Sequence, residues 1–427
     1  MKLFAFSLWA ASVAVLCSTT FTQAQQPHKG TNHEKVLYTF GKTSVGYLSN
    51  ALIRDAKGNL FGSNLGGGNT TGNCSPPWNG CGTVFELTAA GKMVVLHTFN
   101  LYPDGAEPTS LVQDARGNLY GATAAGGSGD CEFGCGTLFK VTPAGKFTLL
   151  HTFGPDGLAV PDSGLTMDAQ GNLYGAVDYG TNALDGAIYE WTTSGKLKVL
   201  YGFSNQSDGV SPYAVIPDDE GNLYGTTARG GDLSCSQGDG SGCGLVYKLN
   251  ISTGVETVLY TFHGGADGAF PSFPAPLVRD KAGNVYGTTT EGGNNQDCIT
   301  TYSSGCGTLF KIDAAGAFSV LATFDGKNGN SPDGVTEDAN GNFYGTTSYA
   351  GRNPCTGGGC GTVFKFSAGR KESVLYNFRG QSDGGLPAVG VVEDSNHNLY
   401  GTTEQGGDLN CTVYAEGCGV IFEITAN

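Results

Sequence analysis

The chain has 427 residues, of which 70 are glycine and 14% are charged, and its formal net charge is −15. Glycine at about twice its usual share predicts many tight turns and few long helices. The acidic balance excludes nucleic acid as an expected partner, because a phosphate-binding protein needs a basic face.

The N-terminus has the pattern of a secretory signal peptide. An apolar stretch from Leu3 to Leu16 is followed by a polar run with small residues before a cleavage site after Ala24. This stretch is too short to span a bilayer, and no later one approaches the roughly 20 residues required. We expect a signal peptide over 1–24, a flexible segment over 25–34, and a mature protein that is secreted, periplasmic or at the cell surface.

An internal repeat occupies the remaining residues, 35–427. The element Asp-x-x-Gly-Asn-aliphatic-aromatic-Gly begins at Asp55, Asp114, Asp168, Asp218, Asp280, Asp338 and Asp394. A Gly-small-apolar-aromatic strand places a ring at Phe85, Phe139, Tyr189, Tyr247, Phe310, Phe364 and Phe422, and an apolar-Leu-x-x-Phe strand ends at Phe40, Phe99, Phe153, Phe203, Phe262, Phe324 and Phe378. Each repeat of about 50–62 residues divides into four short strands separated by turn signals. This pattern predicts an all-β, seven-bladed β-propeller with four antiparallel strands per blade and aromatic cores between blades.

The two ends of the repeat region predict how the ring closes. Residues 35–40 form a lone fourth strand, whereas the last repeat ends on a third strand, Gly419 to Ile424. Pairing the two completes the last blade and removes the exposed edges that an open array would leave.

The repeat resembles that of secreted bacterial tandem-repeat proteins of the GloVer-containing ("choice-of-anchor") type. Their repeat is similar to Gly-Asn-Leu-Tyr-Gly-Thr-Thr, a Gly-Gly loop, Gly-Cys-Gly-Thr-Val-Phe-Lys and Val-Leu-Tyr-Thr-Phe, and the similarity covers residues 35 to 427. The resemblance implies a propeller fold and export, and it implies no catalytic residue.

Twelve cysteines of the mature chain form six close pairs, each in the loop between the second and third strands. The pairs are Cys74–Cys81, Cys131–Cys135, Cys235–Cys243, Cys298–Cys306, Cys355–Cys360 and Cys411–Cys418, and only the third repeat lacks one. Zinc sites favour shorter spacings used two pairs at a time, whereas an exported chain with an even count favours disulfides. We expect disulfides that stabilise long glycine-rich loops.

The disulfide loops share one face of the predicted propeller with the connections between blades. Those connections carry an [Asp/Asn]-Gly-x-x-Pro motif, with its aspartates at Asp104, Asp156 (with one extra residue), Asp208, Asp267 and Asp383. Long loops on a rigid scaffold are where binding residues gather, so these aspartates and Trp78 of the first disulfide loop are our candidate ligand-binding residues. The alternative is that the aspartates only stabilise turns.

Catalysis finds little support in the sequence. No nucleophile elbow, metalloprotease motif or phosphate loop occurs, and His97 and His151 occupy a strand position that holds tyrosine in other repeats. The Asp-x-x-Gly aspartates are expected to cap their own turns, with a repeated Ca²⁺ site as the alternative and no cofactor otherwise.

We therefore expect a monomeric extracellular binding protein whose ligand is a glycan or another protein at the disulfide-loop face. The alternatives are a secreted carbohydrate-active hydrolase or lyase that uses axial carboxylates, and a structural surface-coat protein. A raised carboxyl pKa beside a second carboxylate in the axial funnel would favour the enzyme.

Overall fold

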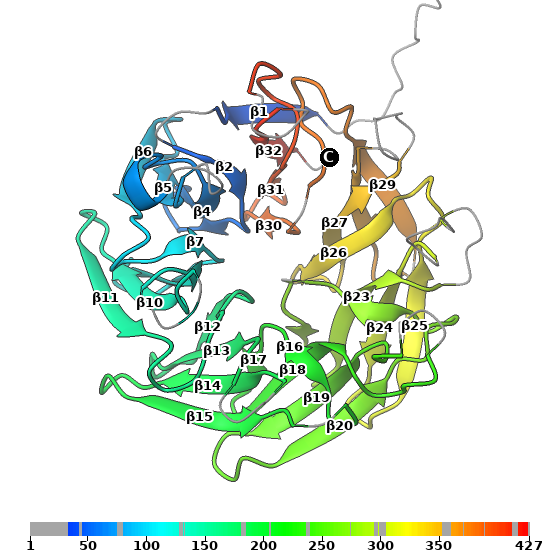
Figure 1. Cartoon of the computed structure of the whole chain (residues 1–427). Helices are drawn as coiled ribbons and strands as arrows, with labels where there is room; N and C mark the ends of the chain where they lie inside the picture. Colours follow the sequence, from blue (N-terminus) through cyan, green and yellow to red (C-terminus); the bar gives the residue numbers. More distant parts are fainter. Residues whose placement is uncertain are drawn as a thin grey trace, which may run out of the picture. The chain divides into compact units, whose positions relative to one another are not determined.

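The chain folds into seven antiparallel sheets arranged in a ring, a seven-bladed β-propeller (Figure 1). The computed structural model describes residues 33–41, 45–74, 80–127, 131, 133–180, 185–204, 206–235, 240–273, 275–293, 298, 305–351, 360–369, 371–387, 389–411 and 417–425. The predicted all-β class and blade number are confirmed. Among these residues no helix is long and apolar enough to cross a membrane.

Blades are numbered here in chain order. Blade 1 contains β2 (Tyr47–Ser49), β3 (Ile53–Arg54), β4 (Leu60–Gly66), β5 (Thr83–Leu87) and β6 (Met93–Thr98), with a 3-10 turn, η1 (Gly72–Cys74), between β4 and β5. Blade 2 contains β7 (Ala106–Pro108), β8 (Val112–Gln113), β9 (Leu119–Ala125), β10 (Thr137–Val141) and β11 (Phe147–Thr152). Blade 3 contains β12 (Leu165–Met167), β13 (Leu173–Val177), β14 (Ala187–Trp191) and β15 (Leu197–Gly202). Blade 4 contains β16 (Val210–Pro212), β17 (Ile216–Pro217), β18 (Asn222–Arg229), β19 (Leu245–Asn250) and β20 (Glu256–Thr261).

The remaining three blades follow the same order. Blade 5 contains β21 (Ala269–Pro271), β22 (Val278–Arg279), β23 (Val285–Glu291), β24 (Thr308–Ile312) and β25 (Phe318–Thr323). Blade 6 contains β26 (Asn330–Glu337), β27 (Phe343–Tyr349), β28 (Thr362–Phe366) and β29 (Glu372–Asn377). Blade 7 contains β30 (Val392–Glu393), β31 (Leu399–Thr402), β32 (Val420–Ile424) and, from the start of the repeat region, β1 (Glu34–Thr39).

The ring closes through β1, as the sequence predicts. This strand, blue in Figure 1, pairs antiparallel with the red β32, from Glu34 opposite Ile424 to Thr39 opposite Val420. The first and last parts of the repeat region thus share one sheet, and the outer edge of β32 is covered.

Aromatic rings join every blade to the next. The phenylalanine after each outer strand meets the ring of the third strand in the following blade, with centroids 5.0–5.7 Å apart in edge-to-face geometry. The series includes Phe40 of blade 7 against Phe85 of blade 1, both fully buried. Because such pairs add to the apolar burial of each ring, the predicted inter-blade cores also stabilise the closure.

The glycine inside each second strand makes room for these rings. A Cβ on Gly121 would lie 2.5 Å from Cζ of Phe139, and one on Gly287 would lie 2.6 Å from Cζ of Phe310. The glycine inside the second strand is therefore required because any side chain there would clash with the ring of the third strand. That ring is in turn needed for the core between blades.

The repeated Asp-x-x-Gly element is a capped turn, as expected. In blade 2, Oδ1 of Asp114 accepts hydrogen bonds from the backbone of Arg116 and Asn118, and Oδ2 accepts them from the side chains of Asn118 and Tyr120. Burial raises the pKa of Asp114, but these hydrogen bonds outweigh it and lower the pKa below its ordinary value. Both oxygens are occupied, which explains the motif without a bound ion.

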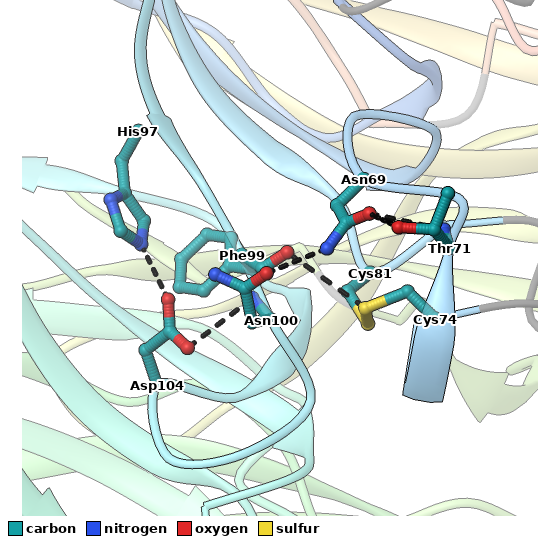
Figure 2. The surroundings of a disulfide bond; sticks show 8 residues. All are labelled: Asn69, Thr71, Cys74, Cys81, His97, Phe99, Asn100 and Asp104. Atoms are coloured by element: carbon teal, nitrogen blue, oxygen red, sulfur yellow. Dashed lines mark hydrogen bonds and ion pairs between the residues drawn. A yellow bond between two sulfur atoms is a disulfide. The ribbon is translucent and has the colours of Figure 1, made fainter.

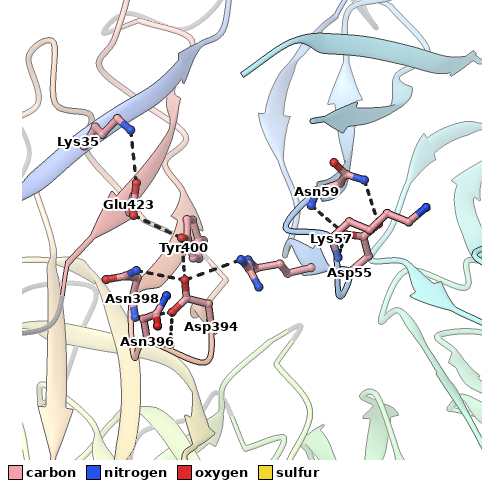
Figure 3. A network of polar contacts seen from close by, with 10 residues as sticks. Lys35, Asp55, Lys57, Asn59, Asp394, Asn396, Asn398, Tyr400 and Glu423 are labelled. Carbon is pink, nitrogen blue, oxygen red and sulfur yellow. Dashed lines mark hydrogen bonds and ion pairs between the residues drawn. The ribbon is translucent and has the colours of Figure 1, made fainter. Parts of the chain in front are cut away.

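The same turns are linked across blades on this face. In blade 7, which Figure 3 shows from close by, Asp394 accepts hydrogen bonds from Asn396, Asn398 and Tyr400. Arg54 of blade 1 approaches the same carboxylate to 3.8 Å and lies over the ring of Tyr400. This contact between blades 1 and 7 strengthens the closure.

Candidate functional site

Five of the six predicted disulfides lie within the described chain. They join Cys74 to Cys81, Cys131 to Cys135, Cys235 to Cys243, Cys298 to Cys306 and Cys411 to Cys418, with Cα atoms 5.2–5.9 Å apart. Cys355 of the sixth pair, Trp78, and residues 1–32 lie outside the described residues.

The disulfide loops and the Asp-Gly-x-x-Pro connections contact each other between blades. The residue before each motif proline has a positive φ of 51–61°, and it donates its backbone N–H to the carbonyl of the second loop cysteine in the preceding blade, or to Asp185 in blade 3. The donors are Glu107, Val160, Ser211, Phe270, Ser331 and Leu386. Because a non-glycine residue before proline normally avoids this conformation, its recurrence marks a rim that the scaffold holds firmly.

The five predicted aspartates of the connections lie at the outer strands. In each case Oδ2 of the aspartate lies 2.7–3.0 Å from a side chain at the end of the preceding outer strand. This side chain is either a tyrosine, whose hydroxyl donates a hydrogen bond, or a histidine, which contacts the carboxylate through Nε2. The pairs are His97–Asp104, His151–Asp156, Tyr201–Asp208, Tyr260–Asp267 and Tyr376–Asp383. Figure 2 shows the first of these beside the Cys74–Cys81 disulfide. The structure thus gives these carboxylates a clear role in holding the connection, and it does not bring them together at the axis.

A cavity of about 310 Å³ lies where the inner strands of all seven blades meet. Its lining comes from residues 51–53, 110–112, 163–166, 214, 275–276, 333–336 and 389–392. Most of these side chains are aliphatic, and Asp333 is the one carboxylate among them. The propeller axis is therefore an apolar chamber with a single acidic group.

The most distinctive polar cluster lies where blades 3, 4 and 5 meet on the disulfide-loop face. We call Asp162, Asp178, Tyr213 and Phe273 the acid–aromatic cluster. Burial, and then the neighbouring charge of Asp178, raise the pKa of Asp162 well above its ordinary value. Burial also raises the pKa of Asp178, against a hydrogen bond from the side chain of Ser211. At neutral pH the pair therefore shares a tendency to keep a proton.

The two rings of the cluster lie beside this acid pair. Burial, then the charges of Asp178 and Asp162, raise the pKa of Tyr213, and the charge of Arg229 acts in the opposite direction. Its ring centroid is 4.9 Å from that of Phe273, which is 39% exposed. Two hydrogen-bonding acids thus border a partly exposed aromatic surface.

A second acid pair lies between blades 6 and 7, and its members, Asp333 and Glu404, hold the same repeat positions as Asp162 and Asp178 but come from neighbouring blades. Asp333 is 6% exposed and accepts a hydrogen bond of 2.7 Å from Oγ of Ser348. Burial raises the pKa of Asp333 well above its ordinary value, and the charge of Glu404 adds to this effect. Burial likewise raises the pKa of Glu404. In both pairs a carboxyl group with a raised pKa lies near a second carboxylate, but of these four acids only Asp333 lines the axial cavity.

Sequence reasoning did not single out either acid pair. Asp162 and Asp333 follow the motif prolines, Pro161 and Pro332, at a position that holds Thr109, Tyr213 and Ser272 in other blades. Aligning the repeats at the proline would have exposed these two departures. Blade 3, the one repeat without a cysteine pair in the sequence, contributes both acids of the acid–aromatic cluster.

Another acidic cluster, on the opposite face, resembles a metal site. Ligand atoms of Asp338, Glu393 and His397 lie within 4.8 Å of one another. Both oxygens of Asp338 already accept hydrogen bonds from Asn340, Asn342 and Tyr344, and Nδ1 of His397 lies 2.6 Å from Glu393. The ligand atoms of these residues are already hydrogen-bonded, so we assign no metal there.

Comparison with known proteins gives the family and the fold. The family described as Gloeobacter/Verrucomicrobia repeat matches residues 23–237, 128–300 and 234–427, which confirms the resemblance found in the sequence. Comparison with curated proteins found no significant match.

Solved structures share the propeller architecture at low sequence identity. "Oligogalacturonate lyase in complex with manganese" is 10% identical with a TM-score of 0.55, and the match covers 94% of each chain. A gluconolactonase from Xanthomonas campestris is 12% identical with a TM-score of 0.43, covering 74% of this chain and 86% of that one. At these identities the likeness concerns the fold alone.

Proposed function

This chain belongs to the Gloeobacter/Verrucomicrobia repeat family, and we propose that it is an extracellular propeller that binds a glycan at the acid–aromatic cluster. Export is supported by the N-terminal apolar stretch from Leu3 to Leu16 and by the disulfides, which form and persist outside the reducing cytoplasm. The disulfide-loop face presents the cluster on a rigid rim, where binding residues are usually found.

The observation that carries this proposal is the placement of two carboxyl groups beside a partly exposed ring pair. A sugar ring has an apolar C–H face that packs on aromatic surfaces, and hydroxyl groups around its edge. Phe273 and Tyr213 supply the surface, and Asp162 and Asp178 supply hydrogen-bond acceptors at its border. Few polar groups around an apolar surface are typical of small-ligand sites.

The test is a polysaccharide pull-down with the mature, oxidised protein, followed by titration of each retained sugar. Phe273→Ala should weaken binding at least tenfold, because burying a phenylalanine side chain is worth about 1.5–3 kcal/mol. Phe133→Ala is the matched control, since Phe133 is 48% exposed and lies outside the cluster. Trp78→Ala tests the ring singled out from the sequence.

The outcomes of this test separate the alternatives. Loss with Phe273→Ala alone supports the cluster, whereas loss with Trp78→Ala alone moves the site to the first disulfide loop. Retention of no sugar in the panel contradicts the proposal and favours a protein partner.

A second candidate function is favoured by the acid pair itself. A carboxyl group with a raised pKa beside a second carboxylate can act as general acid while its neighbour acts as base. Asp162 and Asp178 would take these roles in a hydrolase or lyase. Cleaved product that disappears in Asp162→Asn, with binding retained, would establish it, and intact sugar throughout would reject it.

A further inference from the structure

The axial cavity has the features of a second, separate binding site. Its volume of about 310 Å³ falls at the lower end of the range for small-ligand pockets. Leu52, Leu111, Leu165 and Val335 are among its walls and are all buried. Because most of the lining side chains are aliphatic, we expect the cavity to favour an apolar body.

Five polar side chains interrupt the apolar wall, Ser110, Ser163, Thr166, Asp333 and Thr336, and two of them bear on the choice of ligand. Ser163 of blade 3 is 1% exposed, and its Oγ has no hydrogen-bond partner in the described part of the chain. Asp333 of blade 6 lines the same cavity and is satisfied on one oxygen by Ser348. A buried hydroxyl left without a partner costs about 1–3 kcal/mol, which a ligand group in the cavity would recover.

The acidic end of the cavity restricts the charge of such a ligand. Asp333 and Glu404 lie close enough that the charge of Glu404 raises the pKa of Asp333. Burial raises the pKa of both acids, so this end of the cavity disfavours negative charge, and an anionic head group would meet the same desolvation cost. A neutral head that donates and accepts hydrogen bonds avoids this cost.

We propose that the axial cavity binds a small neutral amphiphile, a linear apolar body with one hydroxyl head that hydrogen-bonds to Ser163. A cavity of 150 Å³ holds benzene, so one of about 310 Å³ holds roughly twelve carbon atoms. The site does not depend on the acid–aromatic cluster, and it would exist whether or not the protein binds glycans.

Straight-chain primary alcohols from hexan-1-ol to tetradecan-1-ol test the proposal, by displacement of the neutral fluorophore N-phenyl-1-naphthylamine from the oxidised protein. Affinity should rise about three- to fourfold per methylene and level off near twelve carbons, when the cavity is full. Dodecanoate at pH 8 should bind at least tenfold more weakly than dodecan-1-ol, because its head is charged.

Variants locate the binding within the cavity. Ala214→Leu and Ala51→Leu, in blades 4 and 1, fill part of it and should each shorten the preferred alcohol by several carbons. Ser163→Ala should weaken dodecan-1-ol binding about fivefold, the effect of one neutral hydrogen bond. Glu220→Gln, an exposed carboxyl on the opposite face, is the control and should change nothing.

Two results would overturn the proposal. A cavity filled by water alone gives no displaceable fluorescence and no dependence on chain length. Binding to an outer surface gives affinities that rise without a plateau and are equal in both filled variants. If Phe273→Ala loses glycan binding and keeps alcohol binding, the axial cavity binds its ligand independently of the acid–aromatic cluster.

Discussion

Replacing Glu256 by glutamine is expected to stabilise the protein at pH 8 and to have little effect at pH 4. Glu256 begins the outer strand of blade 4, at a position where blade 5 has Phe318 stacked on Tyr260 of the preceding blade, 3.6 Å between centroids. Its Oε1 is buried without a hydrogen-bond partner among the described residues. A carboxyl group therefore occupies a position that suits an apolar ring.

The expected pH dependence follows from the surroundings of this carboxyl group. Burial, and then the charge of Asp208, raise the pKa of Glu256 from 4.5 to about 7. The folded state thus holds a proton that the unfolded state releases near pH 4.5. The stability that this proton provides is complete below pH 4.5 and is lost as the pH rises through about 7.

The magnitude can be worked from the same shift. Each pKa unit corresponds to 1.36 kcal/mol, so a shift from 4.5 to about 7 represents about 3 kcal/mol if fully expressed. Because the side chain is only half-buried, solvent screening reduces this to about 1–2 kcal/mol. Glutamine carries no charge at any pH and removes the penalty.

The assay is urea denaturation of the wild-type and variant proteins at pH 4, 6 and 8. The midpoint of Glu256→Gln should exceed that of the wild type at pH 8 and approach it at pH 4, while the exposed control Glu220→Gln follows the wild type throughout. An equal gain at all three pH values, or a loss at pH 8, would refute the electrostatic reasoning. Glu34 and Glu372, whose pKa values burial also raises to about 7, should behave similarly.

Three further predictions concern packing and covalent links. Gly121→Ala should destabilise by about 1–3 kcal/mol in urea denaturation, because its Cβ would meet Cζ of Phe139 at 2.5 Å, whereas Gly265→Ala, with open space around it, should be nearly neutral. Phe40→Ala should cost about 3–5 kcal/mol and expose the closure to limited proteolysis, and unchanged resistance to protease would contradict that role. Reduction of the disulfides should speed cleavage within the cysteine loops before the blades unfold, as mass spectrometry of early fragments would show.

The architecture was predictable because each repeat carries its own local instructions. Turn aspartates such as Asp114, glycines such as Gly121 and rings such as Phe139 recur in register, and each has a packing or hydrogen-bonding reason visible within one repeat and its neighbour. The closing strand followed from counting strands at the two ends. The observed strand β1, Glu34–Thr39, lies one residue earlier at both ends than the predicted 35–40.

The candidate site was less predictable because it depends on contacts between blades. Asp162 and Asp178 lie at the two ends of the β12–β13 hairpin of blade 3, but Tyr213 and Phe273 come from blades 4 and 5. No pattern within one repeat predicts that side chains of three blades converge. The connection aspartates were noticed because they repeat, and a feature shared by most blades more often serves the scaffold than a single ligand.

The pairing of β1 with β32 sets an order of events during biosynthesis. Each of blades 1–6 is contiguous in the chain and can form as soon as its own residues have emerged, but β1 must wait for a partner that is synthesised after every other strand of the propeller. Until Val420 to Ile424 are available, the growing array keeps an unpaired strand at its start and an unclosed interface at its end. A chain shortened by its final six or seven residues would therefore retain most of its sheet and still lack the ring.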